Sequence, residues 1–236
     1  MKIVIATPTR GNPDDQFLEC RDMLVAELKK RGHEVQIMTS RGSSLIDHAR
    51  STMATAFLDD PQNHDVLLWI DDDMIFDAQE IAEMCLDACM LQAIVGAASM
   101  AKRPQGHVNF IPSPDCAELK FFENSDIYGV LSVGTGICAV HRNVFERMLQ
   151  LLPDVFPRIM CGNQPTYPFY ANIIHEGQWY GEDSSFCVRA RQAGCSVYVD
   201  ARCRVFHKGP YLYGLEDSGN MLDRAGTLTM KFRNPG

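Results

Sequence analysis

Apolar and polar positions alternate along the first hundred residues in a pattern that predicts strands and helices in turn. Four short apolar runs are expected to form strands, at residues 3–7, 34–39, 66–70 and 93–98. Three longer stretches carry apolar residues at helical spacing and are expected to form helices, at residues 14–31, 43–58 and 78–91. This alternating order is typical of a mostly parallel sheet covered by helices. The first part of the chain is therefore predicted to be Rossmann-like.

The pattern changes in the second part of the chain. Two stretches are expected to be rich in loops, at residues 103–126 and 153–181. Strands are expected at residues 130–140, 196–200 and 204–206, and helices at residues 143–152 and 183–193. No repeat and no low-complexity linker separates the two parts, so we expect them to share one continuous sheet.

The composition is that of a single globular domain. The chain has 236 residues, of which 46% are hydrophobic and 22% are charged, and this length can build one large core with a ligand cleft. The apolar run at residues 3–7 is too short for a secretory signal, and no later run approaches the length of a membrane span. We therefore expect a soluble, cytoplasmic protein with no transmembrane segment.

Charge and cysteine content narrow the function further. The formal net charge of −8 disfavours non-specific attraction to nucleic acid or anionic membranes, because the long-range field repels phosphate. The nine cysteines are scattered and mostly lie in apolar surroundings, so they are expected to be reduced core thiols.

An acidic triplet, Asp71, Asp72 and Asp73, directly follows the apolar run at residues 66–70. Ligands of parallel α/β sheets collect outside the carboxyl ends of the strands, which is where this triplet is expected to lie. Adjacent carboxylates repel one another unless a cation or backbone amides compensate, and a divalent ion bridging carboxylate and diphosphate oxygens does so. The alternative is a solvated acidic turn ahead of a helix that Asp77 caps. We favour a site for Mn²⁺ or Mg²⁺.

The sequence lacks both common glycine-rich phosphate motifs. There is no Gly-x-Gly-x-x-Gly after the first strand and no Gly-Lys-Ser/Thr loop, which excludes dinucleotide oxidoreductases and P-loop enzymes. The remaining candidates for nucleotide and phosphate contacts are Thr7, Pro8 and Arg10 after the first strand, and Arg50 in the second helix.

A second group of candidate residues lies later in the chain. Glu182 and Asp183 stand at the start of a predicted helix, where they serve either in catalysis or as ordinary capping residues. Gly134 and Gly136 allow the backbone to approach a ligand closely. His207 follows a short apolar pair and is a residue type that can bind a transition metal.

These motifs, in this order, resemble the GT-A-fold glycosyltransferases, especially family-two-like members from bacteria and phages. The resemblance covers roughly residues 2–210 and rests on four ordered segments, at residues 66–73, 133–146, 181–194 and 207. It implies an α/β GT-A fold, with a Rossmann-like, mostly parallel mixed sheet flanked by helices. It also implies one domain over residues 1–236, with a nucleotide-binding half at about 1–101 and an acceptor and catalytic half at about 102–236. A phage protein of this kind would act in the host cytoplasm.

The resemblance assigns roles on the donor side. Asp73, with Asp71 assisting, would hold Mn²⁺ or Mg²⁺ against the donor diphosphate, and His207 matches a late metal ligand. Asp71 would also reach the ribose, and Asp72 is a further donor-site residue. The candidate diphosphate contacts are Lys102, Arg103 and Lys208. A UDP-sugar is the favoured donor, in a hexosyltransferase-like reaction.

The resemblance also assigns roles on the acceptor side. Asp183, or failing it Glu182, matches the carboxylate that deprotonates the acceptor hydroxyl in inverting members, and Gly134 to Gly136 would line the donor-sugar and acceptor pocket. A late metal-binding histidine is frequent in retaining members, so inversion is favoured without being fixed. The acceptor is expected to be a glycan or a hydroxymethylated base in phage DNA.

Two other functions remain open. A sugar nucleotidyltransferase would also use acidic residues and Mg²⁺, but its glycine-rich loop is missing from residues 7–11. A catalytically inactive sugar-binding relative would retain the fold, but four intact residues argue against it: Asp71, Asp73, Asp183 and His207.

Overall fold

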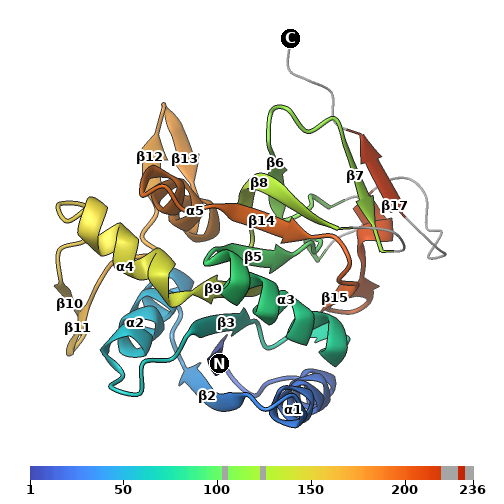
Figure 1. Cartoon of the computed structure of the whole chain (residues 1–236), viewed down its shortest axis with the longest axis horizontal. Coiled ribbons are helices and arrows are strands. Elements are labelled where there is room, and N and C mark those ends of the chain that lie inside the picture. The colour runs from blue at the N-terminus through green and yellow to red at the C-terminus, as the bar shows by residue number, and fades with distance from the viewer. Residues whose placement is uncertain (103–105, 123–125, 219–227, 232–236) are drawn as a thin grey trace.

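The computed structural model describes residues 1–102, 106–122, 126–218 and 228–231, and its centre is an eight-stranded sheet (Figure 1). The strands, in their order across the sheet, are β2 (Glu34–Arg41), β1 (Lys2–Thr9), β3 (Val66–Ile70), β9 (Ile137–His141), β5 (Ile94–Ala97), β14 (Val197–Asp200), β8 (Ile127–Val133) and β6 (Phe110–Pro112). All of them run in one direction except β8 and β9. The prediction of a mostly parallel mixed sheet is confirmed, and strands from both parts of the chain lie in it.

Helices cover both faces of this sheet (Figure 1). One face packs against α1 (Asp15–Lys30) and α3 (Ala78–Leu91), and the other against α2 (Ile46–Asp59), α4 (Arg142–Leu151) and α5 (Glu182–Gln192). Strand β3 shows how both faces are buried. Val66, Leu68 and Ile70 pack into the core beneath α1 and α3, while Leu67 and Trp69 pack into the core beneath α2, α4 and α5. A strand that is apolar at every position is therefore buried on both sides.

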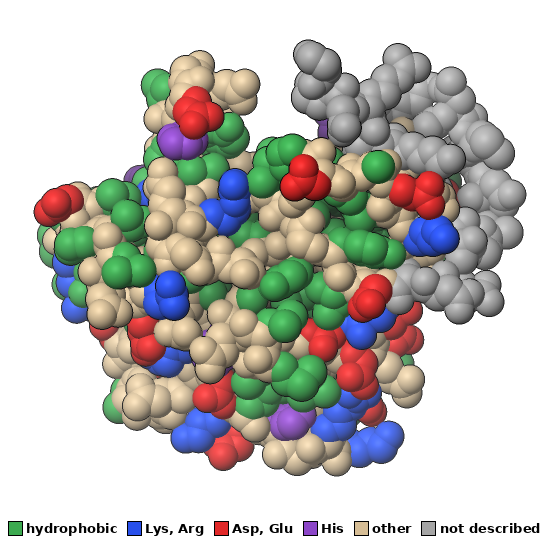
Figure 2. Space-filling model, turned by 45° about the horizontal axis from the view of Figure 1, so that its top comes forward, with side chains coloured by type: hydrophobic (Ala, Val, Ile, Leu, Met, Phe, Trp, Pro, Cys, Tyr) green, Lys and Arg blue, Asp and Glu red, His purple; other side chains and the backbone are tan. Residues whose placement is uncertain are grey.

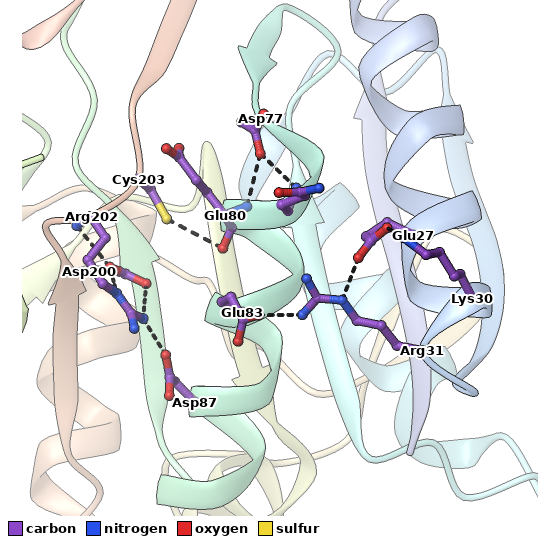
Figure 3. Close-up of polar contacts among 11 residues, drawn as sticks. Glu27, Lys30, Arg31, Asp77, Glu80, Glu83, Asp87, Asp200, Arg202 and Cys203 are labelled. Carbon is purple, nitrogen blue, oxygen red and sulfur yellow. Dashed lines mark hydrogen bonds and ion pairs between the residues drawn. The ribbon is translucent and has the colours of Figure 1, made fainter.

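Helix α3 has the boundaries that the sequence predicts. Asp77 is its N-cap, and its Oδ1 accepts hydrogen bonds from the backbone N–H groups of Gln79 at 2.8 Å and Glu80 at 3.2 Å (Figure 3). Asp77 therefore caps this helix, as the alternative interpretation of the acidic turn expected. The helix ends at Gln92, whose left-handed conformation (φ 50°) stops the regular hydrogen-bond pattern.

Ion pairs attach α3 to its neighbours on both sides (Figure 3). On one side Arg31 contacts Glu83 of α3 at 2.5 Å and Glu27 at 2.7 Å. On the other side Arg202 bridges Asp87 of α3 and the fully buried Asp200 at the end of β14. These contacts fix α3 on the sheet, where it also contacts β3, the strand that ends at the acidic triplet.

The single strand expected at residues 130–140 is wrong. The chain forms two strands, β8 and β9, separated by Gly134, Thr135 and Gly136. The two strands lie at different places in the sheet, because β8 pairs with β14 and β6 whereas β9 lies between β3 and β5. The apolar residues on both sides of the glycines hide this change of position in the sequence.

The two loop-rich stretches contain short strands that the sequence did not reveal. Within residues 103–126 these are β6 and β7 (Glu118–Phe121), and β7 pairs with β17 (Leu228–Lys231). Within residues 153–181 there are two hairpins, β10 (Ile159–Cys161) with β11 (Gln164–Thr166) and β12 (Ile173–His175) with β13 (Gln178–Tyr180). Strands of three or four residues carry too little alternation to be recognised from their sequence.

A three-stranded sheet lies beside the acidic triplet. Strand β4 (Met74–Phe76) follows the triplet at once and pairs with β15 (Val205–Lys208), which pairs in turn with β16 (Leu212–Tyr213). The strand expected at 204–206 therefore continues through Lys208, and His207 lies within it, opposite Met74. A 3₁₀ helix follows at Leu215–Ser218.

Helix α2 begins at Ile46, three residues later than expected, because Leu45 is still extended.

The surface mixes charge types. Figure 2 shows acidic, basic and hydrophobic side chains close together on one face of the molecule. Among the helices that the structure describes, none is both long and apolar enough for a membrane span. All nine cysteines lie in the described ranges as free thiols, and five of them are buried: Cys85, Cys138, Cys187, Cys195 and Cys203.

Candidate active site

A cavity of about 430 Å³ opens at the carboxyl ends of β1 and β3, within the usual size range of small-molecule sites. Its lining includes most of the predicted site residues: Pro8, Arg10, Arg50, Asp71, Asp72, Asp73, Glu182 and Asp183. It also includes Thr9, Ser43, Ile46 and Ala49, which the sequence had not singled out. None of these four carries a clear sequence signal, and Thr9 ends β1 only because the strand runs two residues beyond the expected end at residue 7. The cavity thus joins the ends of two strands to the first turns of α2 and α5.

The three aspartates of the triplet have different partners. These are Arg50 for Asp71, Thr9 for Asp72, and both Lys102 and His207 for Asp73. The backbone N–H of Asp71 donates to the carbonyl oxygen of Gly136 at 2.8 Å, which fixes the start of the turn against the loop between β8 and β9. Mutual repulsion among the carboxylates is therefore relieved by a separate donor for each.

Asp71 faces a buried arginine. Arg50, on α2, is only 3% exposed, and its Nη1 and Nη2 lie 3.1 and 3.2 Å from the two carboxylate oxygens of Asp71. Burial raises the pKa of the Asp71 carboxyl; the guanidinium opposes this shift, and the charges of Asp183 and Asp73 add to it. Burial alone would lower the pKa of Arg50, but the charges of Asp71 and Asp183 outweigh it and raise that pKa. Asp71 is thus engaged in an ion pair inside the protein.

Asp73 and His207 are the two side chains of the site best suited to bind a metal ion together. Nε2 of His207 lies 3.2 Å from Oδ1 of Asp73, and its Nδ1 lies 2.9 Å from the carbonyl oxygen of Met100. Burial would raise the pKa of Asp73, but hydrogen bonds from His207 and Lys102 and their charges lower it overall. Burial likewise would lower the pKa of His207, and the hydrogen bonds with Asp73 and Met100 raise it overall.

The separation of this pair is that of an ion pair, and it is also compatible with two ligands of one divalent ion. Two ligand atoms at right angles, each about 2.1 Å from an ion, lie about 3.0 Å apart, close to the separation of Oδ1 of Asp73 and Nε2 of His207. The Met100 carbonyl accepts from Nδ1, which orients the ring with Nε2 toward Asp73, as outer partners of metal-bound histidines do. Within the described ranges no group of three or more His, Cys, Asp and Glu side chains has a metal-binding arrangement. Asp73 and His207 would therefore share the ion with water and ligand oxygens.

Glu182 and Asp183 lie in the first turn of α5, but neither caps it. The N-cap is Gly181, without a side-chain hydrogen bond. Asp183 instead accepts, at Oδ1, a hydrogen bond from Oγ1 of Thr135, and the same oxygen lies 3.9 Å from Nε of Arg50. Burial and the charge of Asp183 raise the pKa of Glu182. Neither carboxylate makes an N-cap hydrogen bond, but both lie in the first turn, where the helix dipole favours negative charge.

The remaining predicted residues lie around the cavity, outside its lining. Thr7 is 1% exposed inside β1. Lys208 contacts Asp14 at 2.8 Å through Nζ. Gly134 is needed for packing, because a Cβ there would lie 2.7 Å from Nδ2 of Asn109. Gly136 and Lys102 touch the turn itself, through Asp71 and Asp73. Arg103 is outside the described residues.

Comparisons with known proteins concern the fold. No protein-family model and no curated protein sequence matches the chain. The solved structure of the protein A197 from STIV is similar, with a TM-score of 0.51 and 14% identity over 96% of this chain and 98% of that one. GalNAc-T7 with UDP, GalNAc and Mn²⁺ gives a TM-score of 0.46 and 12% identity, over 87% of this chain and 43% of that one. The 4-diphosphocytidyl-2C-methyl-D-erythritol synthase of Anaerococcus prevotii gives 0.44 and 13%, over 94% of both chains. With its sheet order and flanking helices, the chain has the mixed α/β fold with a mostly parallel sheet that the sequence predicts, and it shares its fold with A197.

Proposed function

We propose that this chain is a metal-dependent glycosyltransferase that transfers a sugar from a nucleotide-sugar donor, with a UDP-sugar favoured, to an acceptor hydroxyl with inversion. One observation supports this most. Asp73 and Asp183 line a single cavity. Asp73 and its partner His207 form a pair suited to bind a metal ion, whereas Asp183 is a second carboxylate whose Oδ1 is hydrogen-bonded to Thr135. Metal-assisted departure of a diphosphate needs the first group, and deprotonation of an acceptor needs the second.

On the donor side, Asp73 and His207 would hold Mn²⁺ or Mg²⁺. The bound ion would offset the charge that develops on the leaving diphosphate. Pro8 and Arg10, at the end of β1, line the same cavity and are suited to contact the nucleotide. Lys102 is already at the Asp73 carboxylate, so its ammonium group is close enough to reach a diphosphate held there.

On the acceptor side, we assign the base to Asp183. The acceptor oxygen attacks the anomeric carbon, the bond from that carbon to the diphosphate oxygen breaks, and the hydroxyl proton passes to Asp183. Its Oδ1 is held by Thr135, which gives the carboxylate a defined orientation. Glu182 lines the same cavity and is the second candidate for this role.

A glycan fits the cavity mouth better than DNA does. Five carboxylates line the cavity, at Asp71, Asp72, Asp73, Glu182 and Asp183, and the chain as a whole carries a net charge of −8. A polyanion would be repelled there. Trp179 on β13, just before α5, is 74% exposed and offers an apolar ring for stacking on a sugar.

The proposal is tested by incubating the protein with a panel of nucleotide sugars and Mn²⁺ and measuring release of the nucleotide diphosphate. We expect slow hydrolysis of one donor, lost on chelation of the metal and in Asp73→Asn. The exposed Asp154→Asn is the matched control and should behave like the wild type. Absence of metal-dependent hydrolysis with every donor would refute the enzyme assignment. Release of pyrophosphate from a nucleoside triphosphate and a sugar phosphate would instead identify a nucleotidyltransferase.

A further inference from the structure

We infer that Arg50 is a positioning residue that links Asp71 on the donor side to Asp183 and thereby determines which oxygen of Asp183 receives the acceptor proton. The inference rests on the proposed function and deepens it. It also replaces the diphosphate contact that the sequence suggested for Arg50 with a role inside the protein.

The surroundings of Arg50 are those of a structural cation. The side chain is 3% exposed, so its charge needs counter-charges within the protein. Asp71 supplies one through both Nη atoms, at 3.1 and 3.2 Å, and Asp183 supplies a second, 3.9 Å from Nε. One guanidinium between two carboxylates leaves no surplus positive charge for a diphosphate. Its place in the site is therefore better explained by the carboxylates than by the donor.

An aromatic block holds Arg50 in place. The guanidinium carbon lies 5.6 Å from the centre of the Trp69 ring, and Nε1 of Trp69 donates to the hydroxyl of Tyr170 at 2.7 Å. Tyr170 stacks on Phe186 of α5, with ring centroids 4.5 Å apart, and its backbone N–H donates to Ser51, the neighbour of Arg50, at 3.1 Å. The helix that carries Arg50 and the helix that carries Asp183 thus both contact the buried Tyr170.

Arg50 and Thr135 approach the same oxygen of Asp183. Oγ1 of Thr135 donates to Oδ1, and Nε of Arg50 lies 3.9 Å from Oδ1. Nε of Arg50 has no hydrogen-bond partner among the described residues. A movement of about 1 Å would bring it to hydrogen-bond distance of Oδ1. Because Oδ1 is hydrogen-bonded to Thr135 and faces the charge of Arg50, Oδ2 is the oxygen left to take the proton.

The geometry also couples the two halves of the reaction. Asp71 stands at the end of β3 beside the donor carboxylates, and Asp183 stands at the start of α5. A shift of Asp71 moves Arg50, and Arg50 then moves with respect to Oδ1 of Asp183. An error of 1 Å in a reacting group can lower a rate by about 10²-fold. We therefore expect substitutions of Arg50 to act on turnover more than on donor binding.

The test compares Arg50→Lys and Thr135→Val in the full-length chain. The three probes are UDP, uridine and the UDP-sugar that the wild type hydrolyses. Lysine can keep the pair with Asp71 but has no second nitrogen to reach Asp183. Both variants should lower the kcat of Mn²⁺-dependent donor hydrolysis by at least about tenfold, while the Kd for UDP stays within about twofold. Arg142→Lys is the control: this mostly buried arginine binds backbone carbonyls of Phe57 and His64 and should lower Tm without lowering kcat.

A loss of UDP affinity in Arg50→Lys that uridine does not share would make Arg50 a diphosphate contact and overturn the inference. A second measurement does not depend on activity. The changes in Tm of Arg50→Met and Asp183→Asn should not add up in the double variant. In Arg50→Met the Asp183 carboxylate has lost its counter-charge, and Asp183→Asn then removes this unpaired charge. Additive shifts in Tm, with normal hydrolysis by the wild type, would refute this inference alone. Absence of wild-type hydrolysis would refute the proposed function and, with it, the positioning role.

Discussion

Nε2 of His207 lies 3.2 Å from Oδ1 of Asp73, because β15 pairs with β4 in a register that sets His207 opposite Met74, the next residue after Asp73. The pair is therefore fixed by backbone hydrogen bonds as well as by its own contact. The N–H of Lys208 donates to the carbonyl oxygen of Asp73 at 2.8 Å and strengthens this register.

Removal of this imidazole should weaken metal binding. We expect His207→Ala to reduce the affinity for Mn²⁺ by at least about tenfold, since even loss of an outer partner of a metal ligand costs 10- to 100-fold. Titration of Mn²⁺ followed by electron paramagnetic resonance, without nucleotide, measures this directly. His48→Ala, at an exposed histidine of α2, should bind Mn²⁺ as the wild type does. An unchanged affinity in His207→Ala would remove His207 from the metal site.

Glu80 should make stability depend on pH. Burial raises the pKa of its carboxyl, and the charges of Asp77 and Asp200 add to this against the hydrogen bond from the N–H of Arg204. Such a group is protonated in both states below its unfolded pKa of about 4.3. Above that pH, the folded state increasingly resists ionisation and loses stability until the pH has passed the raised folded pKa.

We therefore expect Glu80→Gln to have a higher Tm than the wild type at pH 7, with the difference falling to zero below about pH 4.3. Thermal unfolding across this pH range measures the effect. Glu19→Gln, at an exposed position of α1, should leave Tm unchanged at pH 7. Equal Tm values for Glu80→Gln and the wild type at pH 7 would show that burial does not oppose the ionisation of Glu80.

A methyl group at Gly134 should disturb both stability and the site. Its Cβ would lie 2.9 Å from Cβ of Asn109, whose side chain is held by the backbone N–H of Ser99 at 2.7 Å and cannot move freely. The overlap should cost about 1–3 kcal/mol, or about 2–4 °C in Tm for each kcal/mol in a chain of this size. Gly129→Ala, on β8 just before Gly134, adds a Cβ that meets nothing within 4 Å and is the matched control.

Because Thr135 is next in the chain and holds Asp183, Gly134→Ala should also lower donor hydrolysis. Calorimetry and the hydrolysis assay together test both effects. A wild-type Tm in Gly134→Ala would mean that the loop absorbs the added methyl group without strain.

Substitution of Trp179 should affect acceptor binding alone. It is 74% exposed and pairs across the hairpin with Ile174, which is 70% exposed. Trp179→Ala should leave Tm unchanged, because exposed substitutions usually stay within ±0.5 kcal/mol. Sugar transfer to a glycan array should fall by about tenfold or more, while donor hydrolysis continues. Met90→Ala, equally exposed on α3, should retain transfer. Full transfer by Trp179→Ala would exclude the ring from acceptor binding.

The sequence predicts the elements whose signals are local. Strand β3 and helix α3 have the expected boundaries, because five apolar residues end in charge at Asp71 and because Asp77 supplies a cap. The split of β8 from β9 was missed, since it depends on which strands lie beside each segment. The short strand β7 was missed for the same reason, because its partner β17 is distant in the chain.

The functional site shows the same difference between local signals and contacts made by distant segments. A strand end with three carboxylates could be recognised from the sequence, as could the acidic start of α5. Which aspartate faces Arg50 and which faces His207 could not be, because α2 and β15 come to the turn from distant parts of the chain. Thr135 was noticed only as part of a glycine loop, since its hydrogen bond to Asp183 exists only after folding.

The place of β9 in the sheet has a consequence for how the protein folds. This strand comes from the second part of the chain, yet it lies between β3 and β5 of the first part. A fragment that stops at residue 101 would leave two strands with unpaired edges, and such edges favour aggregation. Synthesis must pass residue 141 before β9 can join β3 to β5, and residue 200 before β14 can join β5 to β8. Pairing over such separations makes folding slow. The chain should therefore unfold as one cooperative unit.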